Sequence, residues 1–336
     1  MTTTVKIDPL HPEPELIRAA ALVLRRGGLV AFPTETVYGL GALALDAEKV
    51  QRIFAAKSRP TQNPLIVHVL DAKMAQRVCA TWPETAQRIA EALWPGPLTL
   101  ILPKRDIVPM VVTAGLTTVA VRAPSHPVAR ALLVELGEPV AAPSANLYTE
   151  ISPTRAEHVR KGLSGRIDLI LDGGPAEVGV ESTVLDLCGP VPTVLRPGAV
   201  TPSQLERVIG HVAVVAEQVA DDHARASPGQ SKKHYAPRAQ VALVPCAAHG
   251  VLQDRMRRVL KARGRVGVLA HSGIGIAAQD GVIIRRLPSE PNEYAANLYN
   301  ALHELEDAGC SHILIEDVPT GEAWDAARDR VSRAAG

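Results

Sequence analysis

The sequence predicts an α/β protein of two domains, in which helices flank a twisted sheet. The chain has 336 residues, which is more than one hydrophobic core usually organises. Short apolar segments alternate with amphipathic ones along most of the chain, as strands and helices do in α/β folds. A polar stretch at 221–239 interrupts this alternation, which then starts again. We therefore expect domains at 1–210 and 240–336, joined by a linker at 211–239.

The N-terminal region begins with an amphipathic helix at 15–26. Gly27 and Gly28 end it, because glycine readily adopts the left-handed conformation that closes a helix. The apolar run 29–32 is a predicted strand, and Asp46 can cap a second helix that runs to residue 56. The same alternation predicts further strands at 65–70, 98–102, 119–121, 140–142, 169–171, 183–187 and 193–195, and helices at 127–136 and 201–209.

The C-terminal region repeats the pattern in fewer residues. Apolar runs predict strands at 241–244, 266–270, 282–284 and 312–316. Helical periodicity predicts helices at 252–262, 294–307 and 322–334. These elements are enough for a second, smaller α/β domain.

The composition is typical of a globular protein of the cytoplasm. Hydrophobic residues make up 46% of the chain and charged residues 21%. The net charge of +1 does not favour nucleic acid as a direct partner, although it permits a local basic patch. The four cysteines are far apart, which argues against a disulfide framework and a structural zinc site. We see no signal-peptide pattern and no apolar run long enough to span a bilayer, so we expect no membrane association.

Polar side chains recur where the predicted strands end. The segment 33–41 carries two threonines, a glutamate and a tyrosine, Ser144 and Asn146 follow the strand at 140–142, and Ser182 and Arg196 lie at other strand ends. Each group alone is equally typical of a turn whose hydroxyls are satisfied locally. Ligands of α/β sheets, however, usually bind beyond the strand ends, so the repetition predicts a binding pocket.

Three basic residues stand near these segments. Lys57 and Arg59 follow a predicted helix, where they either complement the helix dipole or bind a triphosphate. Arg122 ends a buried strand and needs an anionic partner, which is a structural carboxylate or a substrate carboxylate. We expect Lys57 and Arg59 to act on phosphate charge and not on the fold. A lone histidine in an apolar strand, such as His68, is more often a packed core residue than a catalyst.

The sequence lacks the common nucleotide-binding and hydrolase motifs. It contains no G-x-x-x-x-G-K-[ST] loop, no G-x-G-x-x-G after a strand, no G-x-S-x-G elbow and no H-E-x-x-H pair. If ATP binds, it uses a different kind of pocket.

Taken together, these segments resemble the threonylcarbamoyl-AMP synthase family, the YrdC-like enzymes, in its long two-domain form. The resemblance is carried, in order, by FPTETVYGL (32–40), KSRP (57–60), NPL (63–65), WPGPLT (94–99), VRAP (121–124), PSAN (143–146), EST (181–183) and LRPG (195–198). The stretch 227–237 is similar to the linker of the long form, although Gln230, Ser231 and Lys232 depart from it. The resemblance implies a YrdC-like twisted mixed sheet, followed by a smaller Rossmann-like domain.

The family makes L-threonylcarbamoyladenylate from L-threonine, bicarbonate and ATP, and releases pyrophosphate. By resemblance, the threonine site would consist of Thr36, His68, Arg122, the backbone of Ala142, and Ser182. The ATP site would consist of Arg59, Asn63, Thr118, Ser144, Ser152, Arg196 and His234. Lys57 and Arg59 would be catalytic through their charge, with help from Asn146, and Mg²⁺ is expected on the nucleotide. The implied partners are downstream proteins that transfer the threonylcarbamoyl group to tRNA, with at most weak direct binding of tRNA.

Two other functions stay open from the sequence. YrdC-like domains also occur in carbamoyltransferases that use carbamoyl-adenylate, but those usually carry zinc-binding cysteine pairs that this chain lacks. A non-catalytic RNA-binding module is disfavoured by the neutral charge and by the absence of basic stretches interleaved with aromatic residues. The role of the C-terminal domain and the oligomeric state are not predicted.

Overall fold

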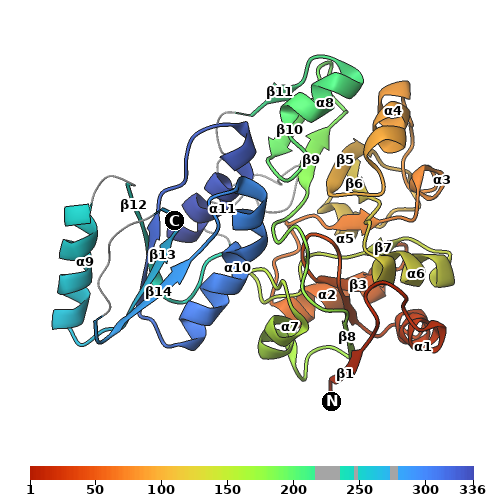
Figure 1. The fold of residues 1–336 in the computed structure, drawn as a ribbon. Coiled ribbons are helices and arrows are strands. Elements are labelled where there is room, and N and C mark those ends of the chain that lie inside the picture. The colour runs from red at the N-terminus through yellow and green to blue at the C-terminus, as the bar shows by residue number, and fades with distance from the viewer. Residues whose placement is uncertain (216–234, 246–248, 273–278) are drawn as a thin grey trace.

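Two sheets form the centres of two α/β domains in a computed structural model of the chain (Figure 1). The structure describes residues 1–215, 235–245, 249–272 and 279–336. Most of the predicted linker, including His234 and the departures at 230–232, lies outside the described residues. The first sheet belongs to the N-terminal domain and the second to the C-terminal domain, and α10 (Pro291–Asp307) and α11 (Asp325–Ala335) lie between the second sheet and the N-terminal domain (Figure 1).

The first sheet has eleven strands and is mixed, as expected. Its spatial order is β1-β8-β2-β3-β7-β4-β6-β5-β9-β10-β11. Parallel and antiparallel pairs alternate irregularly; β2, for example, is parallel to β8 and antiparallel to β3. The strands are β1 (Thr3–Lys6), β2 (Val30–Phe32), β3 (Gly39–Leu43), β4 (Ile66–His68), β5 (Leu98–Pro103), β6 (Thr118–Arg122), β7 (Val140–Ala141), β8 (Leu169–Asp172), β9 (Thr183–Asp186), β10 (Thr193–Arg196) and β11 (Ala213–Val214).

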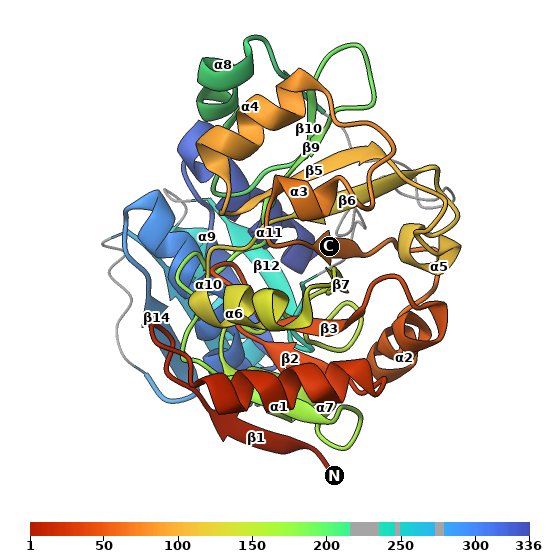
Figure 2. The ribbon, with the colours of Figure 1, turned by 90° about the vertical axis from the view of Figure 1, so that its right-hand side faces the viewer.

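Helices cover this sheet on both faces. Helices α1 (Pro14–Arg25) and α6 (Pro127–Leu136) pack side by side over Val30 and Phe32 (Figure 2). Leu29 and Ala31 point to the opposite face, because side chains alternate along a strand. That face carries the largest core cluster, formed with α2 (Ala47–Lys57), α4 (Glu84–Leu93), α7 (Ala156–Leu163) and α8 (Pro202–Ile209); α3 (Ala72–Ala75) and α5 (Met110–Thr113) border it.

The second sheet is wholly parallel, in the order β12-β15-β13-β14. Helix α9 (His249–Lys261) packs on one face of it, and α10 and α11 pack on the other. The core cluster beneath α10 and α11 also contains Val37, Ile151 and Val180 of the first domain, so the two domains share buried apolar surface. The remaining elements are β12 (Gln240–Val244), β13 (Val266–Ala270), β14 (Val282–Arg286), β15 (His312–Glu316) and the 3₁₀ turn η1 (Glu322–Trp324).

The segment 33–41 differs from its sequence prediction. Its second half is not a loop but the start of β3, which pairs antiparallel with β2 through Gly39 and Gly41. A Cβ on Gly41 would lie 2.8 Å from the ring of Phe32 and 3.0 Å from Val140, so only glycine fits between these neighbours. Among the described residues, no helix is long and apolar enough to cross a membrane.

Candidate active site

An open cavity lies where several strands of the first sheet end. His68 in β4 pairs in register with Arg122 in β6, and both side chains point to the same face. Loops after β2 and β7 and before β9 complete the walls. The lining residues are Thr34, Thr36, Val37, Gly39, Arg59, Ile66, His68, Arg122, Ala142, Pro143, Ser144, Glu181, Ser182, Arg196 and Tyr235.

All five residues predicted for the threonine site line this one cavity. Arg122 donates a hydrogen bond from Nη1 to the hydroxyl of Thr36 at 2.8 Å. The Ser182 hydroxyl lies 2.7 Å from that of Thr99 and accepts from Arg196 at 3.2 Å. The structure thus brings together groups that are up to 146 positions apart in the sequence, between Thr36 and Ser182.

Arg122 has a carboxylate partner that the sequence analysis left undecided. Its Nη2 lies 2.8 Å from Oε1 of Glu35, and both side chains are 4% exposed. The contact is an ion pair without hydrogen-bond alignment, since both oxygens of Glu35 lack a hydrogen-bond partner in the described part of the chain. Glu35 compensates the charge of Arg122, while the Nε of Arg122 has no hydrogen-bond partner among the residues that the structure describes.

His68 is a neutral group in this site at ordinary pH. Burial, reinforced by the positive charge of Arg122, lowers its pKa to about 3. Its ring meets Phe32 edge to face with centroids 6.2 Å apart. Its Nδ1 is buried and has no hydrogen-bond partner within the described ranges, so it can take part in binding a ligand as a neutral polar group.

Two further guanidinium groups line the cavity, from Arg59 and Arg196. Arg59 donates to the carbonyl of Pro64 at 3.0 Å, and its guanidinium lies 5.8 Å from the ring centroid of Tyr148. Arg196 donates from Nε and Nη2 to the carbonyl of Ser182. Burial lowers the pKa of both, that of Arg59 to about 10, so Arg59 stays charged at neutral pH.

Lys57 occupies a different position from the one expected of a phosphate-binding residue. It is buried at the last position of α2 and does not line the cavity. Its Nζ donates to the carbonyls of Ser144, at 2.5 Å, and of Asn146. Burial, with the nearby charge of Arg59, holds the pKa of Lys57 well below its usual value. Lys57 thus anchors the loop that presents Ser144 to the cavity, and we correct the expectation that it has no part in the fold.

Three other residues predicted for the nucleotide, Asn63, Thr118 and Ser152, are not among the residues that line the cavity. Asn63 donates to the hydroxyl of Tyr148 at 3.2 Å. Thr118 begins β6, at the end opposite Arg122, which is ~13 Å away by the rise of a strand. The Ser152 hydroxyl donates to Glu181 at 2.5 Å. Their roles, like that of His234, stay predictions.

Sequence reasoning missed several residues that shape the cavity. Thr34 lines it and exchanges a hydrogen bond with Thr36 at 2.9 Å. Glu181 and Tyr235 also line it, and Tyr235 adopts a left-handed backbone with φ of 61°. Glu181 belongs to the EST motif at 181–183 and Tyr235 to the linker-like stretch at 227–237, so the sequence motifs could have pointed to both residues. Nothing in the sequence pattern indicated that Arg330, from α11, would bond to Glu181.

Unpaired buried groups gather at this cavity. Among the described residues, Arg59 Nε, His68 Nδ1 and Arg122 Nε are buried without a hydrogen-bond partner. Buried polar atoms are normally bonded, so these atoms indicate where a ligand would bind. Three arginines with hydroxyls between them suit a ligand that carries several negative charges. The fold and the cavity together define an α/β protein whose strand ends carry an arginine-lined cavity of a kind that suits anions.

This chain belongs to the Sua5/YciO/YrdC family. Residues 22–198 match the family described as "Telomere recombination", and residues 200–336 match the domain described as "Threonylcarbamoyl-AMP synthase, C-terminal domain". The mixed sheet, the second domain and the resemblance inferred from the sequence motifs are thereby confirmed.

Curated relatives and a solved structure match this chain over nearly its whole length. The chain is 44% identical to the threonylcarbamoyl-AMP synthase of Pyrococcus abyssi, over 95% of this chain and 94% of that protein. It is 43% identical to the synthase of Bacillus subtilis, over 96% and 94%. The crystal structure of Pyrococcus abyssi Sua5 complexed with L-threonine superposes with a TM-score of 0.91 at 38% identity, covering 100% of this chain and 97% of that one.

Proposed function

We propose that this protein is an L-threonylcarbamoyladenylate synthase that converts L-threonine, bicarbonate and ATP to threonylcarbamoyl-AMP and pyrophosphate. One observation carries the proposal. The five residues predicted for threonine line a single cavity together with Arg59 and Arg196, which suit phosphate groups. Relatives that match this chain over nearly their whole length bear the same name, and one has been solved with L-threonine.

The chemistry joins two steps in one site. The threonine amine adds to bicarbonate with loss of water, which gives a carbamate on nitrogen. A carbamate oxygen then attacks the α-phosphorus of ATP, the bond to the β-phosphate oxygen breaks, and pyrophosphate leaves with the electron pair. Because the carbamate and ATP are both anions, the main tasks of the site are to position them and to offset their repulsion.

The threonine carboxylate would bind at Arg122, which Thr36 and Glu35 hold in place. Neutral His68 and the hydroxyl of Ser182 would face the rest of the amino acid. A neutral imidazole is suited here because it does not compete with Arg122 for the carboxylate.

The nucleotide would bind across Arg59, Arg196 and Ser144, with Asn63, Thr118, Ser152 and His234 extending the site. Lys57 would act through the backbone of the loop at 144–146, to which its Nζ donates hydrogen bonds. Mg²⁺ would bind mainly to phosphate oxygens and water, as it usually does with nucleotides. The described residues offer no group of three or more His, Cys, Asp or Glu side chains as a protein-only site.

We also propose that residues 1–210 form the catalytic unit and 211–239 the linker. The product would pass to downstream proteins that modify tRNA in the cytoplasm. Direct binding of tRNA, if present, would be weak given the net charge of +1.

The test is a pyrophosphate assay with mass spectrometry on the purified protein, ATP, Mg²⁺ and bicarbonate, with and without L-threonine. We expect pyrophosphate only with threonine, together with a product of threonylcarbamoyl-AMP mass. Pyrophosphate release without threonine would instead support the carbamoyltransferase function. RNA binding without any turnover would support the non-catalytic alternative.

A further inference from the structure

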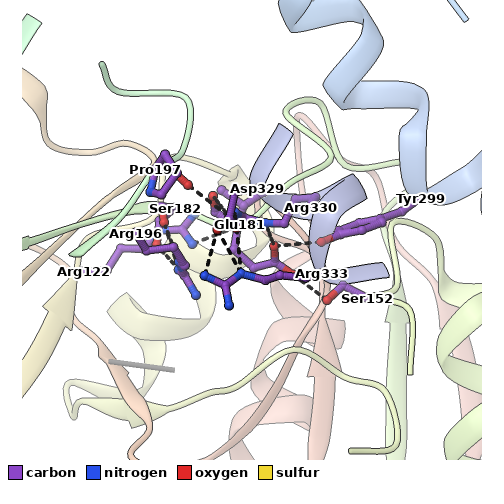
Figure 3. Close-up of polar contacts among 11 residues, drawn as sticks. Arg122, Ser152, Glu181, Ser182, Arg196, Pro197, Tyr299, Asp329, Arg330 and Arg333 are labelled. Carbon is purple, nitrogen blue, oxygen red and sulfur yellow. Dashed lines mark hydrogen bonds and ion pairs between the residues drawn. The ribbon is translucent and has the colours of Figure 1, made fainter. Parts of the chain in front are cut away.

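Glu181 is a buried meeting point between the two domains. Its Oε1 accepts from the hydroxyl of Ser152 at 2.5 Å, within the first domain. Its Oε2 accepts from the Tyr299 hydroxyl at 3.0 Å and from Nε of Arg330 at 2.7 Å, both in the C-terminal domain (Figure 3). One carboxylate thus joins a residue of the catalytic domain to α10 and α11.

Arg330 also donates hydrogen bonds to the backbone of two segments that form the cavity wall. Its Nη2 donates to the carbonyl of Glu181 at 3.3 Å and to the carbonyl of Pro197 at 3.2 Å (Figure 3). These carbonyls directly precede Ser182 and directly follow Arg196, and both of those residues line the cavity. A single guanidinium therefore ties together the two backbone segments that carry a threonine-site residue and a phosphate-site residue.

The electrostatics agree with a permanently charged pair. Burial works against ionisation of Glu181, but the charges of Arg330 and Arg196 outweigh it and lower its pKa. Burial likewise opposes the charge of Arg330, yet Glu181 and Asp329 hold its pKa well above the usual value. Arg330 is fully buried, and its guanidinium lies 5.4 Å from the ring of Tyr235, which also lines the cavity.

We propose that Arg330 is a positioning residue for the substrate site, through which the docked C-terminal domain holds Ser182 and Arg196 in their binding geometry. The inference rests on the proposed function for the identity of the ligands. It gives the C-terminal domain a role in shaping the substrate site, which the family match and the cavity lining alone do not indicate.

Arg330 is better suited to positioning than to simple domain adhesion. Buried ion pairs contribute little net stability compared with apolar residues of similar size, and the shared apolar cluster already joins the domains. The planar guanidinium, by contrast, reaches three acceptors of two segments from two separate nitrogens, Nε and Nη2, whereas a lysine offers a single nitrogen.

The test compares Arg330→Lys with a matched control, Arg328→Lys. Arg328 lies on the same helix and bonds to the carbonyl of Pro319 and pairs with Asp325, within the C-terminal domain. The milder variant Tyr299→Phe removes only one hydrogen bond to Glu181 and guards against loss of folding. For each protein we would measure L-threonine affinity by calorimetry, KM and kcat for pyrophosphate release, thermal unfolding, and amide hydrogen exchange of segment 181–198.

We expect Arg330→Lys to raise the L-threonine dissociation constant and KM about tenfold or more, as loss of charged hydrogen bonds would. Tyr299→Phe should raise them about threefold. Exchange should accelerate in 181–198 in both variants, while Arg328→Lys stays like the wild type. Two outcomes would overturn the inference. In the first, Arg330→Lys and Tyr299→Phe keep wild-type affinity and wild-type exchange. In the second, all three variants lose stability but none changes its affinity.

A wild-type protein without threonine-dependent turnover would overturn the proposed function instead, and hydrogen exchange would still decide whether Arg330 holds the segment.

Discussion

The guanidinium of Arg122 lies 2.8 Å from the carboxylate of Glu35, and both side chains are buried. The pair stands beside Thr36 in the cavity proposed for threonine. Removing one member of a buried ion pair is strongly destabilising, because the other charge is left without compensation. A bound carboxylate at Arg122 would restore that compensation.

We predict that Glu35→Gln lowers the free energy of unfolding by about 3 kcal/mol. We further predict that saturating L-threonine raises the melting temperature of this variant more than that of the wild type, because the ligand supplies the missing anion. Thermal unfolding with and without L-threonine measures both effects.

Glu138→Gln is the matched control for this experiment. Glu138 pairs with Arg77 at 3.0 Å, but both side chains are 45% exposed, and exposed pairs contribute about 0–1 kcal/mol. We expect it to behave like the wild type. An equal threonine-induced shift in Glu35→Gln and the wild type would contradict the assignment of the carboxylate to Arg122.

Lys57 provides the second prediction, through its bonds to the carbonyls of Ser144 and Asn146. Lys57→Met keeps most of the buried volume but leaves both carbonyls without this donor, which costs about 1–3 kcal/mol for each unsatisfied group. We expect lower stability together with weaker ATP binding, measured by chemical unfolding and by calorimetry. Full stability with lost turnover would instead favour a direct and purely electrostatic role at the phosphates.

The sequence predicted the cavity better than it predicted what supports it. Strand ends could be read from apolar runs, and the polar residues placed there, such as Thr36, Arg122 and Ser182, do line one cavity. The alternation could not show that β3 would form from a glycine-rich segment, because Gly41 fits there only against Phe32 and Val140 of neighbouring strands.

The bond between Arg330 and Glu181 could not be predicted from the sequence either. The two residues are 149 positions apart, and helical periodicity treats an arginine in α11 as a solvated residue. Its burial follows only from how the second domain docks on the first, which local patterns do not encode. The same holds for Lys57, whose partners are backbone carbonyls and leave no trace in side-chain composition.

A stacked histidine pair joins α7 to α10 and supports a prediction about pH. The rings of His158 and His303 lie 3.8 Å apart between centroids, at 19°. Burial lowers the pKa of His158 to about 3, with help from His303, and burial lowers that of His303 to about 4. Both are therefore neutral in the folded protein at pH values where an unfolded histidine is protonated.

At these two histidines, the unfolded chain binds more protons than the folded one between pH 6.5 and about 3. The contribution of the neutral histidine pair to the free energy of unfolding is therefore fully present above pH 6.5 and is lost as the pH falls through the folded pKa values. We predict that His158→Gln reduces the slope of unfolding free energy against pH by on the order of 1 kcal/mol per pH unit between pH 6 and 5. Urea unfolding at several pH values measures this slope. An unaltered slope in His158→Gln would contradict the prediction.

Gly198 supports the last prediction, because it lies directly against the segment that carries Ser182. A Cβ at this position would stand 2.3 Å from the nitrogen of Thr183 and 2.6 Å from the carbonyl carbon of Ser182, and both are backbone atoms that cannot rotate away. Gly198→Ala must therefore displace segment 181–183, on which Glu181 and Ser182 meet the cavity. Overpacking of this kind costs about 1–3 kcal/mol of stability, and we expect L-threonine affinity to fall about tenfold or more in calorimetry.

Gly189→Ala is the control, since its Cβ would lie 3.7 Å from its nearest neighbour in the loop between β9 and β10. If Gly198→Ala bound L-threonine as tightly as Gly189→Ala, the position of Ser182 would not govern recognition, and the threonine site would have to lie elsewhere in the cavity.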